Sequence, residues 1–258
     1  TLRLATEASR GGDYAQAAAL VDQIIATGTK EDVLGYALFQ KGIAAVKANR
    51  WADVAGPMEQ MLAAFPNSPQ ATWAKFYVAE SYYRQRNYEA AAEQFARLDR
   101  DVEGQSETWL GVVPLRRGDL LARNKQWAAA YAMLENIEED FPGFNQQYEV
   151  DYLMGRCLAN QARFQEARDA YGRAVANVHG RRTETAAKAQ WNIGETYFHQ
   201  KNYEEAIRAF SRVELLYDYP HWQASSLLEA GKCYEMLGKW SDAQNSYQRI
   251  VNDFAETA

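Results

Sequence analysis

The amino-acid sequence predicts an all-α protein, built as a right-handed solenoid of seven helical hairpins, and three observations lead to this. The composition is rich in Ala and poor in Val and Ile, which favours helix over sheet because Ala has the highest helix propensity. A pattern of aromatic, small and large apolar residues recurs every 37 to 39 positions. Within each copy, the spacing of these residues is that of one face of a helix.

Composition also limits the classes of function. The chain has 258 residues, 47% hydrophobic and 24% charged, so it can bury a core. It carries a net charge of −6, and its only compact basic cluster is the short stretch 179–182, so we expect no nucleic-acid partner. No window approaches the apolar length of a membrane helix, so we expect no direct membrane insertion.

The second helix of each hairpin is predicted from an aromatic residue, here called the anchor. A small residue follows three positions later in most copies, and a large apolar residue follows seven positions later. Asn87–Leu98 reads NYEAAAEQFARL and Asn202–Val213 reads NYEEAIRAFSRV. These positions share one helix face, so each anchor should begin a helix that packs through that face. The seven anchors are Tyr14, Trp51, Tyr88, Trp127, Phe164, Tyr203 and Trp240.

The first helix of each hairpin is predicted from the residues upstream of the anchor. Nine positions before every anchor stands Gly or Ala, and a small residue there allows the two helices to approach closely. A single hairpin cannot bury its apolar face, so the copies should stack on one another as one solenoid domain covering residues 1–258. The residues nine before the anchors are Ala5, Gly42, Ala79, Gly118, Gly155, Gly194 and Gly231.

Two longer spacings and one proline mark irregular places. The 39-residue spacings place insertions near Asp99–Glu107 and Asn177–Glu184, both polar and Gly-containing, which should be loops. Pro114 falls in the first helix of the fourth hairpin, so that helix either begins near Val113 or is kinked at the proline. We favour the late start, after a short turn around Gly111. The first hairpin lacks the beginning of its first helix and no polar capping helix follows the last one, so we expect a fragment of a longer chain.

The clearest copy resembles the tetratricopeptide repeat (TPR) family, and the resemblance extends over nearly the whole chain. The residues that match its consensus are Gly194, Tyr197, Tyr203, Ala206 and Phe210. Pro66, Pro142 and Pro220 fall near the turn after the second helix, where the family tends to place proline. The period is longer than that of a typical TPR. With the stretch Ala63–Leu98, it is similar to the repeats of bacterial cell-envelope TPR proteins of the CpoB-like and BamD-like kinds.

The cysteines and histidines do not indicate a redox or metal site. Cys157 and Cys233 occupy the same register two hairpins apart, too far for a disulfide, so we expect buried free thiols. Glu195 and His199 are spaced i, i+4, which could be half of a metal site. However, Glu80–Arg84 and Asp119–Arg123 hold the same two positions, so we interpret all three as acid-to-base pairs. We expect no metal and no cofactor.

No catalytic constellation is present in the sequence. There is no Gly-rich phosphate loop after a strand and no nucleophile elbow, so we expect a protein that is not an enzyme.

The concave groove of the solenoid is the predicted binding site. In a TPR solenoid the first helices line this groove. We assign to the groove the first-helix positions that the core pattern does not use. Aromatic and Arg side chains there suit a peptide-binding groove, because aromatic residues give large rigid contacts. Some of these aromatic residues could instead pack between neighbouring first helices, above all Phe39, Phe76, Tyr152 and Trp191. The predicted groove residues are Tyr36, Phe39, Trp73, Phe76, Glu80, Tyr83, Arg84, Asp119, Arg123, Tyr152, Arg156, Lys188, Trp191, Glu195, Phe198 and His199.

The function predicted from these observations is non-catalytic binding of a protein partner, as a peptide or a helix, in the concave groove. The long period favours a scaffold in a bacterial cell envelope or periplasm. Two alternatives stay open. One is a cytoplasmic adaptor, or a scaffold that self-assembles as a homo-oligomer through its chain ends. The other is the regulatory arm of an enzyme that lies outside this fragment.

Overall fold

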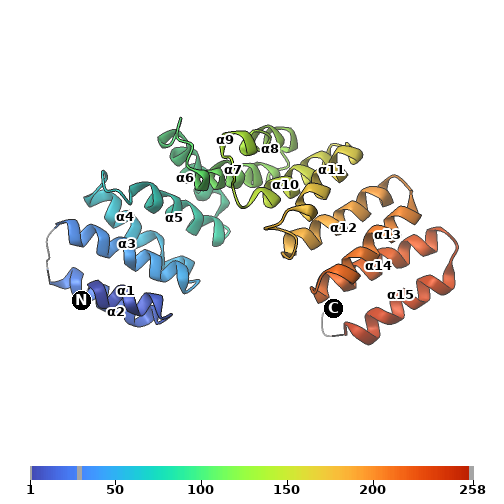
Figure 1. Cartoon of the computed structure of the whole chain (residues 1–258), viewed down its shortest axis with the longest axis horizontal. Helices are drawn as coiled ribbons and strands as arrows, with labels where there is room; N and C mark the ends of the chain where they lie inside the picture. The colour runs from blue at the N-terminus through green and yellow to red at the C-terminus, as the bar shows by residue number, and fades with distance from the viewer. Residues whose placement is uncertain (1, 28–30, 256–258) are drawn as a thin grey trace. The chain divides into compact units, whose positions relative to one another are not determined.

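The computed structural model describes residues 2–27 and 31–255. The secondary structure of these residues is helical throughout, and no strand forms among them. The chain divides into two compact units, Thr1–Gln105 and Ser106–Ala258, and Figure 1 shows the helices of each unit following one another in chain order. This confirms the all-α prediction. Consecutive helices pair as seven hairpins within the described residues.

The first unit contains three hairpins. Its elements are α1 (Leu2–Arg10), α2 (Tyr14–Ala26), α3 (Glu31–Lys47), the 3-10 turn η1 (Trp51–Asp53), α4 (Ala55–Ala64), α5 (Ala71–Arg84) and α6 (Tyr88–Asp101). Helices α1, α3 and α5 are the first helices, and α2, α4 and α6 the second helices.

The second unit contains four hairpins. Its elements are η2 (Thr108–Gly111), α7 (Val112–Arg123), α8 (Trp127–Leu134), α9 (Ile137–Asp140), α10 (Gln147–Asn160), α11 (Phe164–Ala176), α12 (Glu184–His199), α13 (Tyr203–Leu216), α14 (Pro220–Met236) and α15 (Trp240–Asp253). Helices α7, α10, α12 and α14 are the first helices, and α8, α11, α13 and α15 the second helices.

Every anchor stands at the first residue of a second helix or, for Trp51, at the start of η1. The third hairpin shows the local reason. Asn87 caps α6 by accepting a hydrogen bond from the backbone N–H of Ala90, and the anchor Tyr88 follows directly. In the second hairpin the α-helix begins only at Ala55. Pro57 has no N–H to donate back to Asp53, so the first turn is a 3-10 turn.

In the five hairpins that have glycine nine positions before the anchor, the core forms where this glycine meets the side chain seven positions after the anchor. A Cβ atom added to Gly155 would lie 2.5 Å from the ring of Tyr171, and one added to Gly194 would lie 2.5 Å from the ring of Phe210. Both rings are fully buried. The small residues therefore leave space for a large side chain of the partner helix. This explains why the two helices of a hairpin can pack closely.

The irregular places agree with the sequence, with three corrections. Residues 99–101, predicted as part of a loop, are the last residues of α6, so that loop begins only after Asp101. η2 covers the turn around Gly111 and α7 begins at Val112, so Pro114 lies in the first turn as predicted. Pro220 is not in a turn, because it is the first residue of α14, where its missing N–H costs nothing. The predicted second helix of the fourth hairpin is broken into α8 and α9, and Ile137, expected on the continuous helix, begins α9.

Candidate functional site

The predicted groove residues all lie on first helices. Helices α3 and α5 carry the seven that belong to the first unit, and α7, α10 and α12 carry the nine that belong to the second. We call these two surfaces the first-helix faces, one for each unit.

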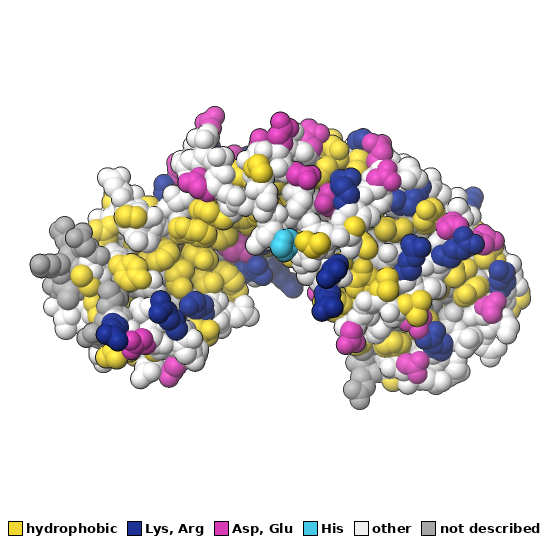
Figure 2. All heavy atoms as spheres, viewed as in Figure 1, with side chains coloured by type: hydrophobic (Ala, Val, Ile, Leu, Met, Phe, Trp, Pro, Cys, Tyr) yellow, Lys and Arg dark blue, Asp and Glu magenta, His cyan; other side chains and the backbone are white. Residues whose placement is uncertain are grey.

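The first-helix face of the unit Thr1–Gln105 is aromatic. The ring centroid of Tyr77 lies 6.5 Å from that of Phe39 on α3 and 6.2 Å from that of Trp73, one turn earlier on α5. The rings of Trp73 and Phe76 meet edge to face at 6.3 Å. Trp73 keeps 36% of its surface exposed. We call Phe39, Trp73, Phe76 and Tyr77 the aromatic strip, and Figure 2 shows hydrophobic side chains gathered over α3 and α5.

A pocket lies beside this strip, between α3 and the turn that joins α4 to α5. Its volume is about 630 Å³, and it is lined by Gly35, Tyr36 and the stretch 64–70. Tyr36 therefore belongs to a concave part of the surface. Gly35 and the turn residues were not among the predicted groove residues, because helix periodicity marks only helix positions.

Near the C-terminal end of α5, charged and aromatic side chains contact one another through an ion pair, a cation–π contact and a ring contact. The Nε of Arg84 donates to Oε1 of Glu80 at 2.6 Å, and Glu80 is only 3% exposed. The Arg84 guanidinium also lies 5.2 Å from the centre of the Trp51 ring. Tyr83 packs edge to face on Tyr88. The predicted i, i+4 pair is confirmed here.

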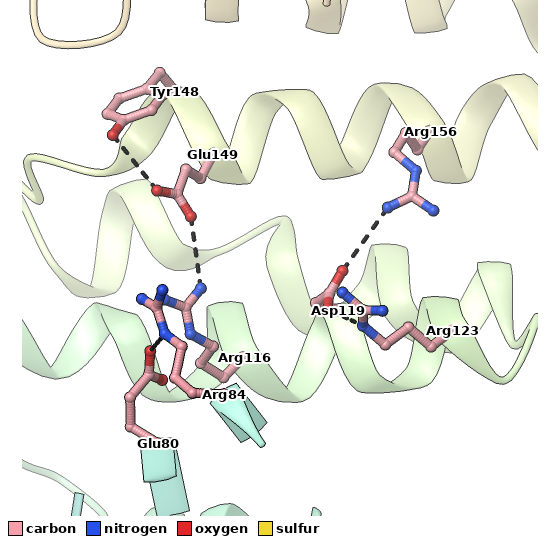
Figure 3. A network of polar contacts seen from close by, with 8 residues as sticks. All are labelled: Glu80, Arg84, Arg116, Asp119, Arg123, Tyr148, Glu149 and Arg156. Atoms are coloured by element: carbon pink, nitrogen blue, oxygen red, sulfur yellow. Dashed lines mark hydrogen bonds and ion pairs between the residues drawn. The ribbon is translucent and has the colours of Figure 1, made fainter. Parts of the chain in front are cut away.

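The first-helix face of the unit Ser106–Ala258 carries a polar network (Figure 3). Asp119 accepts from Nε of Arg123 at 2.5 Å, and its other oxygen lies 3.8 Å from Arg156 on α10. Arg116 on α7 lies 3.5 Å from Glu149 on α10. One carboxylate thus lies between two arginines from adjacent first helices.

The third predicted acid-to-base pair does not form. His199 stacks on Phe164, with ring centroids 6.0 Å apart and planes 13° apart, instead of meeting Glu195. Oε1 of Glu195 is buried without a hydrogen-bond partner among the described residues. Burial, followed by the negative charge of Glu229, raises the pKa of Glu195 to about 7, and Lys232 opposes this shift.

The remaining residues of this face lie against neighbouring aromatic rings. Lys188 lies 3.0 Å from Glu184 and above the ring of Trp222, at 5.7 Å from its centre. Phe198 packs edge to face on the anchor Tyr203, with centroids 5.6 Å apart.

The four aromatic residues expected to pack internally are half-buried, but three of them pack in a way that the sequence did not predict. The ring of Phe76 meets Phe95, that of Tyr152 meets Tyr171, and that of Trp191 meets Phe210, at 6.0 to 6.3 Å. These partners lie on the second helix of the same hairpin, at the position seven after the anchor. Trp191 also meets Trp222 on the next first helix. Phe39 packs against the core of the second hairpin.

The thiols and acidic groups show no reactive arrangement. Cys157 and Cys233 are buried and free, as predicted, and burial raises their thiol pKa to about 11 and about 12, so the nucleophilic thiolate is disfavoured. Across residues 2–27 and 31–255, no three His, Cys, Asp or Glu side chains come together as metal ligands. In the same residues, no helix has the length and apolar character to span a membrane.

The repeat geometry and the sequence lead to one family. The sequence profile of the tetratricopeptide repeat-like domain matches residues 34–192, more than half of the chain. The chain is a tetratricopeptide repeat protein. A second tetratricopeptide repeat profile matches residues 184–254. No curated protein matches the sequence.

Solved TPR structures share the fold. The apo form of RapI has a TM-score of 0.73 at 13% identity, over 93% of this chain and 70% of RapI. PilW, described as a widely conserved type IV pilus biogenesis factor, has a TM-score of 0.66 at 21% identity, over 85% of this chain and 93% of PilW. YrrB, described as a TPR protein with an unusual peptide-binding site, has a TM-score of 0.55 at 21% identity, over 75% of this chain and 90% of YrrB.

Proposed function

We propose that this TPR protein is a non-catalytic scaffold that binds a segment of a partner protein, as a peptide or a helix, on its first-helix faces. The observation that carries the proposal is the aromatic strip, where Trp73 stays 36% exposed although its neighbours are packed. Exposed, rigidly held aromatic side chains are the typical anchors of protein interfaces. The likeness of the fold to YrrB, a TPR protein with an unusual peptide-binding site, supports the same mode of binding.

The polar network of the second unit supports partner binding through polar contacts. Arg123 and Arg156, on adjacent first helices, hold Asp119 between them, and their side chains are 40% and 32% exposed. Guanidinium groups held in this way offer donors to a carboxylate of a partner. The scaffold would therefore use apolar contacts on one unit and charge-assisted hydrogen bonds on the other.

The compartment that we propose is the bacterial cell envelope. The long repeat period led to this expectation, and the likeness to PilW, a type IV pilus biogenesis factor, supports it. A cytoplasmic adaptor and the regulatory arm of an enzyme are the alternatives. A homo-oligomer through the chain ends is a further candidate, favoured by the exposed Trp240 and Val251 on α15.

Affinity capture tests the proposal and its alternatives together. The protein is immobilised and exposed separately to the envelope and cytosolic fractions of its source, as wild type, Trp73→Ala or Leu216→Ala. Leu216 is the control, because it is 65% exposed on a second helix. We expect one envelope protein to be retained by wild type and Leu216→Ala and lost by Trp73→Ala. Capture only from cytosol would contradict the compartment, and equal capture by all three baits would contradict the site.

A further inference from the structure

We propose that one edge of the second unit docks on an anionic lipid bilayer, with aliphatic side chains entering the headgroup layer and arginines binding lipid phosphates. The inference goes beyond the proposed function, because it assigns a second binding surface that uses none of the residues of the first-helix faces. We call this surface the loop edge. The residues that define it are Val178, Arg181, Arg182, Arg212, Leu215 and Leu216.

Two loops of the second unit meet at the loop edge. One is the stretch 177–183, which follows α11, and the other is the stretch 217–219, which joins α13 to α14. The hydroxyl of Tyr219 donates to the carbonyl of Arg182 at 3.0 Å, so the two loops are in direct contact. The side chain of Asn177 accepts hydrogen bonds from two backbone N–H groups of its own loop, at 2.9 and 3.3 Å. The loop that carries two of the arginines is therefore held by hydrogen bonds to itself and to the next loop.

The C-terminal end of α13 contributes Arg212, Leu215 and Leu216 to the same edge. Glu214 points toward α15, because it forms an ion pair with Arg249 of that helix. Two positions along a helix turn the side chain by about 200°, so Arg212 and Leu216 lie on the side of α13 that faces away from α15. Figure 1 shows α11, α13 and α15 following one another, so this side faces the end of α11 and the first of the two loops.

The aliphatic side chains of the loop edge project into solvent. Val178 is 70% exposed, Leu215 78% and Leu216 65%, and Leu215 and Val178 are the two most exposed large hydrophobic side chains of the described residues. Removing such side chains from water is favourable, since they keep most of their apolar surface hydrated. Side chains that protrude this far are not the walls of a groove, so what receives them has to deform around them or carry a matching pocket.

The chemistry of these side chains favours a lipid surface over a protein partner. Val and Leu are under-represented among the residues that dominate the binding energy of protein interfaces, where Trp, Tyr and Arg lead. Aliphatic side chains next to basic ones are typical of surfaces that lie in the plane of a membrane, with the apolar groups at the boundary of the acyl chains. A fluid bilayer accepts protruding side chains without a matching pocket.

The arginines of the loop edge favour an anionic bilayer. Arg181, Arg182 and Arg212 are exposed, and none of them forms an ion pair with another residue in the described part of the chain. Guanidinium groups bind phosphate oxygens through two parallel N–H donors. The whole chain carries a net charge of −6, so an anionic membrane repels most of the protein and attracts this edge, which orients the molecule.

The carboxylates beside the loop edge do not cancel its positive charge. Glu214 is paired with Arg249, and Glu184 lies 3.0 Å from Lys188. Asp218 in the second loop is exposed and forms no ion pair with another described residue, so it opposes one of the three arginines. The edge therefore keeps an excess of positive charge.

Co-sedimentation of the whole protein with lipid vesicles tests the proposal. The probes are vesicles of phosphatidylcholine alone and vesicles of equal parts phosphatidylcholine and phosphatidylglycerol. We expect wild type to bind the anionic vesicles, to ignore the neutral ones and to be released by high salt. Arg181→Gln/Arg182→Gln and Leu215→Gln/Leu216→Gln should each bind the anionic vesicles about tenfold more weakly or worse.

Two matched variants control for the loss of charge and of apolar surface elsewhere. Arg86→Gln/Arg100→Gln removes two exposed arginines of the first unit that also form no ion pair with a described residue. Leu4→Gln/Met236→Gln removes two exposed apolar side chains, 56% and 59% exposed, that lie outside the loop edge. Both variants should bind the vesicles as wild type does. Thermal unfolding checks that all four variants fold.

Several outcomes would overturn the proposal. These are equal binding to both kinds of vesicle, binding to neither, and a loss of binding in the control variants that equals the loss in the loop-edge variants. Complete inhibition by millimolar glycerol phosphate would also overturn it, since this would show a site for a soluble phosphate instead of a membrane surface.

Partner capture separates the loop edge from the proposed function. Capture by an immobilised protein needs no vesicle, so both loop-edge variants should retain the partner that Trp73→Ala loses. A loop-edge variant that lost this partner would show that the edge binds protein, and the membrane proposal would be wrong. Failure of vesicle binding alone would leave the proposed scaffold function standing.

Discussion

The contact between a glycine of the first helix and a large side chain of the second helix sets the packing of most hairpins. Leu134 is such a side chain: a Cβ atom on Gly118 would lie 2.7 Å from it. Glycine lowers helix stability by about 1 kcal/mol relative to alanine, so these positions give up helix propensity in return for close packing. The exceptions are Ala5 and Ala79, which hold this position in the first and third hairpins and are both buried. Alanine is therefore compatible with the fold but not ideal at this position.

We predict opposite effects for two glycine-to-alanine substitutions in helices. Gly194→Ala should destabilise the protein by about 1 kcal/mol, because overpacking against Phe210 exceeds the gain in helix propensity. Gly172→Ala should stabilise it by about 0.5–1 kcal/mol, because nothing lies within 4 Å of the added Cβ atom. Urea unfolding of both variants measures these changes. A stabilised Gly194→Ala variant would contradict the packing account.

The buried carboxylate of Glu195 should make stability depend on pH. Its pKa in the folded protein is raised from 4.5 to about 7, so between these values the folded state holds a proton that the unfolded state has released. The free energy of unfolding should therefore fall as pH rises through this window. The groups that act on Glu195 are Glu229 and Lys232 of α14.

Thermal unfolding at pH 5 and pH 8 tests this dependence. Glu195→Gln should reduce the loss of stability between the two pH values and should be more stable than wild type at pH 8, since glutamine carries no charge to bury. Glu204→Gln, an exposed change in the first turn of α13, is the control and should keep the wild-type dependence. An identical pH profile for wild type and Glu195→Gln would count against burial of the charge.

At the scale of elements, each turn within a hairpin has the same conformation. Two residues before every anchor, φ is positive, between 55° and 85°. In the third hairpin, the N–H of Arg86 donates to the carbonyl of Tyr83, and the N–H of Asn87 donates to that of Tyr82, which is the Schellman arrangement. Only two of the seven residues are glycine. The seven are Gly12, Asn49, Arg86, Lys125, Ala162, Lys201 and Gly238.

Glycine at one of the other positions should therefore stabilise the protein. Ala162 has φ of 58°, a conformation that costs a residue with a side chain about 1 kcal/mol or more. We predict that Ala162→Gly raises the free energy of unfolding by about 1 kcal/mol, as measured by urea denaturation. Ala129→Gly, an exposed site inside α8, should lower it by about 1 kcal/mol. Destabilisation by both changes would contradict the turn assignment.

The elements that could be predicted from the sequence are those that repeat. The anchors mark second helices because the same interface has to form in every hairpin, and seven copies make the pattern visible. The break between α8 and α9 and the 3-10 turn at Trp51 each occur once, so periodicity could not predict them. The positive φ before each anchor was hidden because Arg, Lys and Ala occupy positions that glycine would have marked.

The candidate site could be predicted from the sequence only in part. Helix periodicity placed Tyr36, Trp73 and Arg156 on first helices, but it could not show the pocket beside Tyr36. That pocket depends on the turn residue Phe65 folding back against Gly35, a contact between segments 30 residues apart in the sequence. The pairing of Phe164 with His199 was missed for a similar reason, because it joins two different hairpins.

At the scale of the whole molecule, the two loops predicted as insertions differ in how they are held. The loop around Gly180 is fixed by the Thr183 hydroxyl, which donates to the Gly180 carbonyl, and by the Tyr219 hydroxyl, which donates to the carbonyl of Arg182. The stretch 103–107 is exposed throughout, and it is where the two compact units meet in the sequence. The stretch 103–107 should therefore open more readily than the loop around Gly180.

Limited proteolysis checks this difference. A protease that cleaves after glutamate should cut first after Glu103 or Glu107, and the two products should correspond to the two compact units. Mass spectrometry identifies the products, and circular dichroism shows whether they stay helical. A first cut after Glu184, beside the fixed loop, would contradict the assignment of the flexible site.

The claim that the first-helix faces bind the partner is tested most directly by photo-crosslinking. A photoreactive phenylalanine analogue replaces Trp73 on α5 or, as the control, Leu216 on the second helix α13, and whole cells that produce each protein are irradiated. We predict a discrete crosslinked partner for position 73 and none for position 216. The same partner at both positions, or a partner at position 216 alone, would contradict the account.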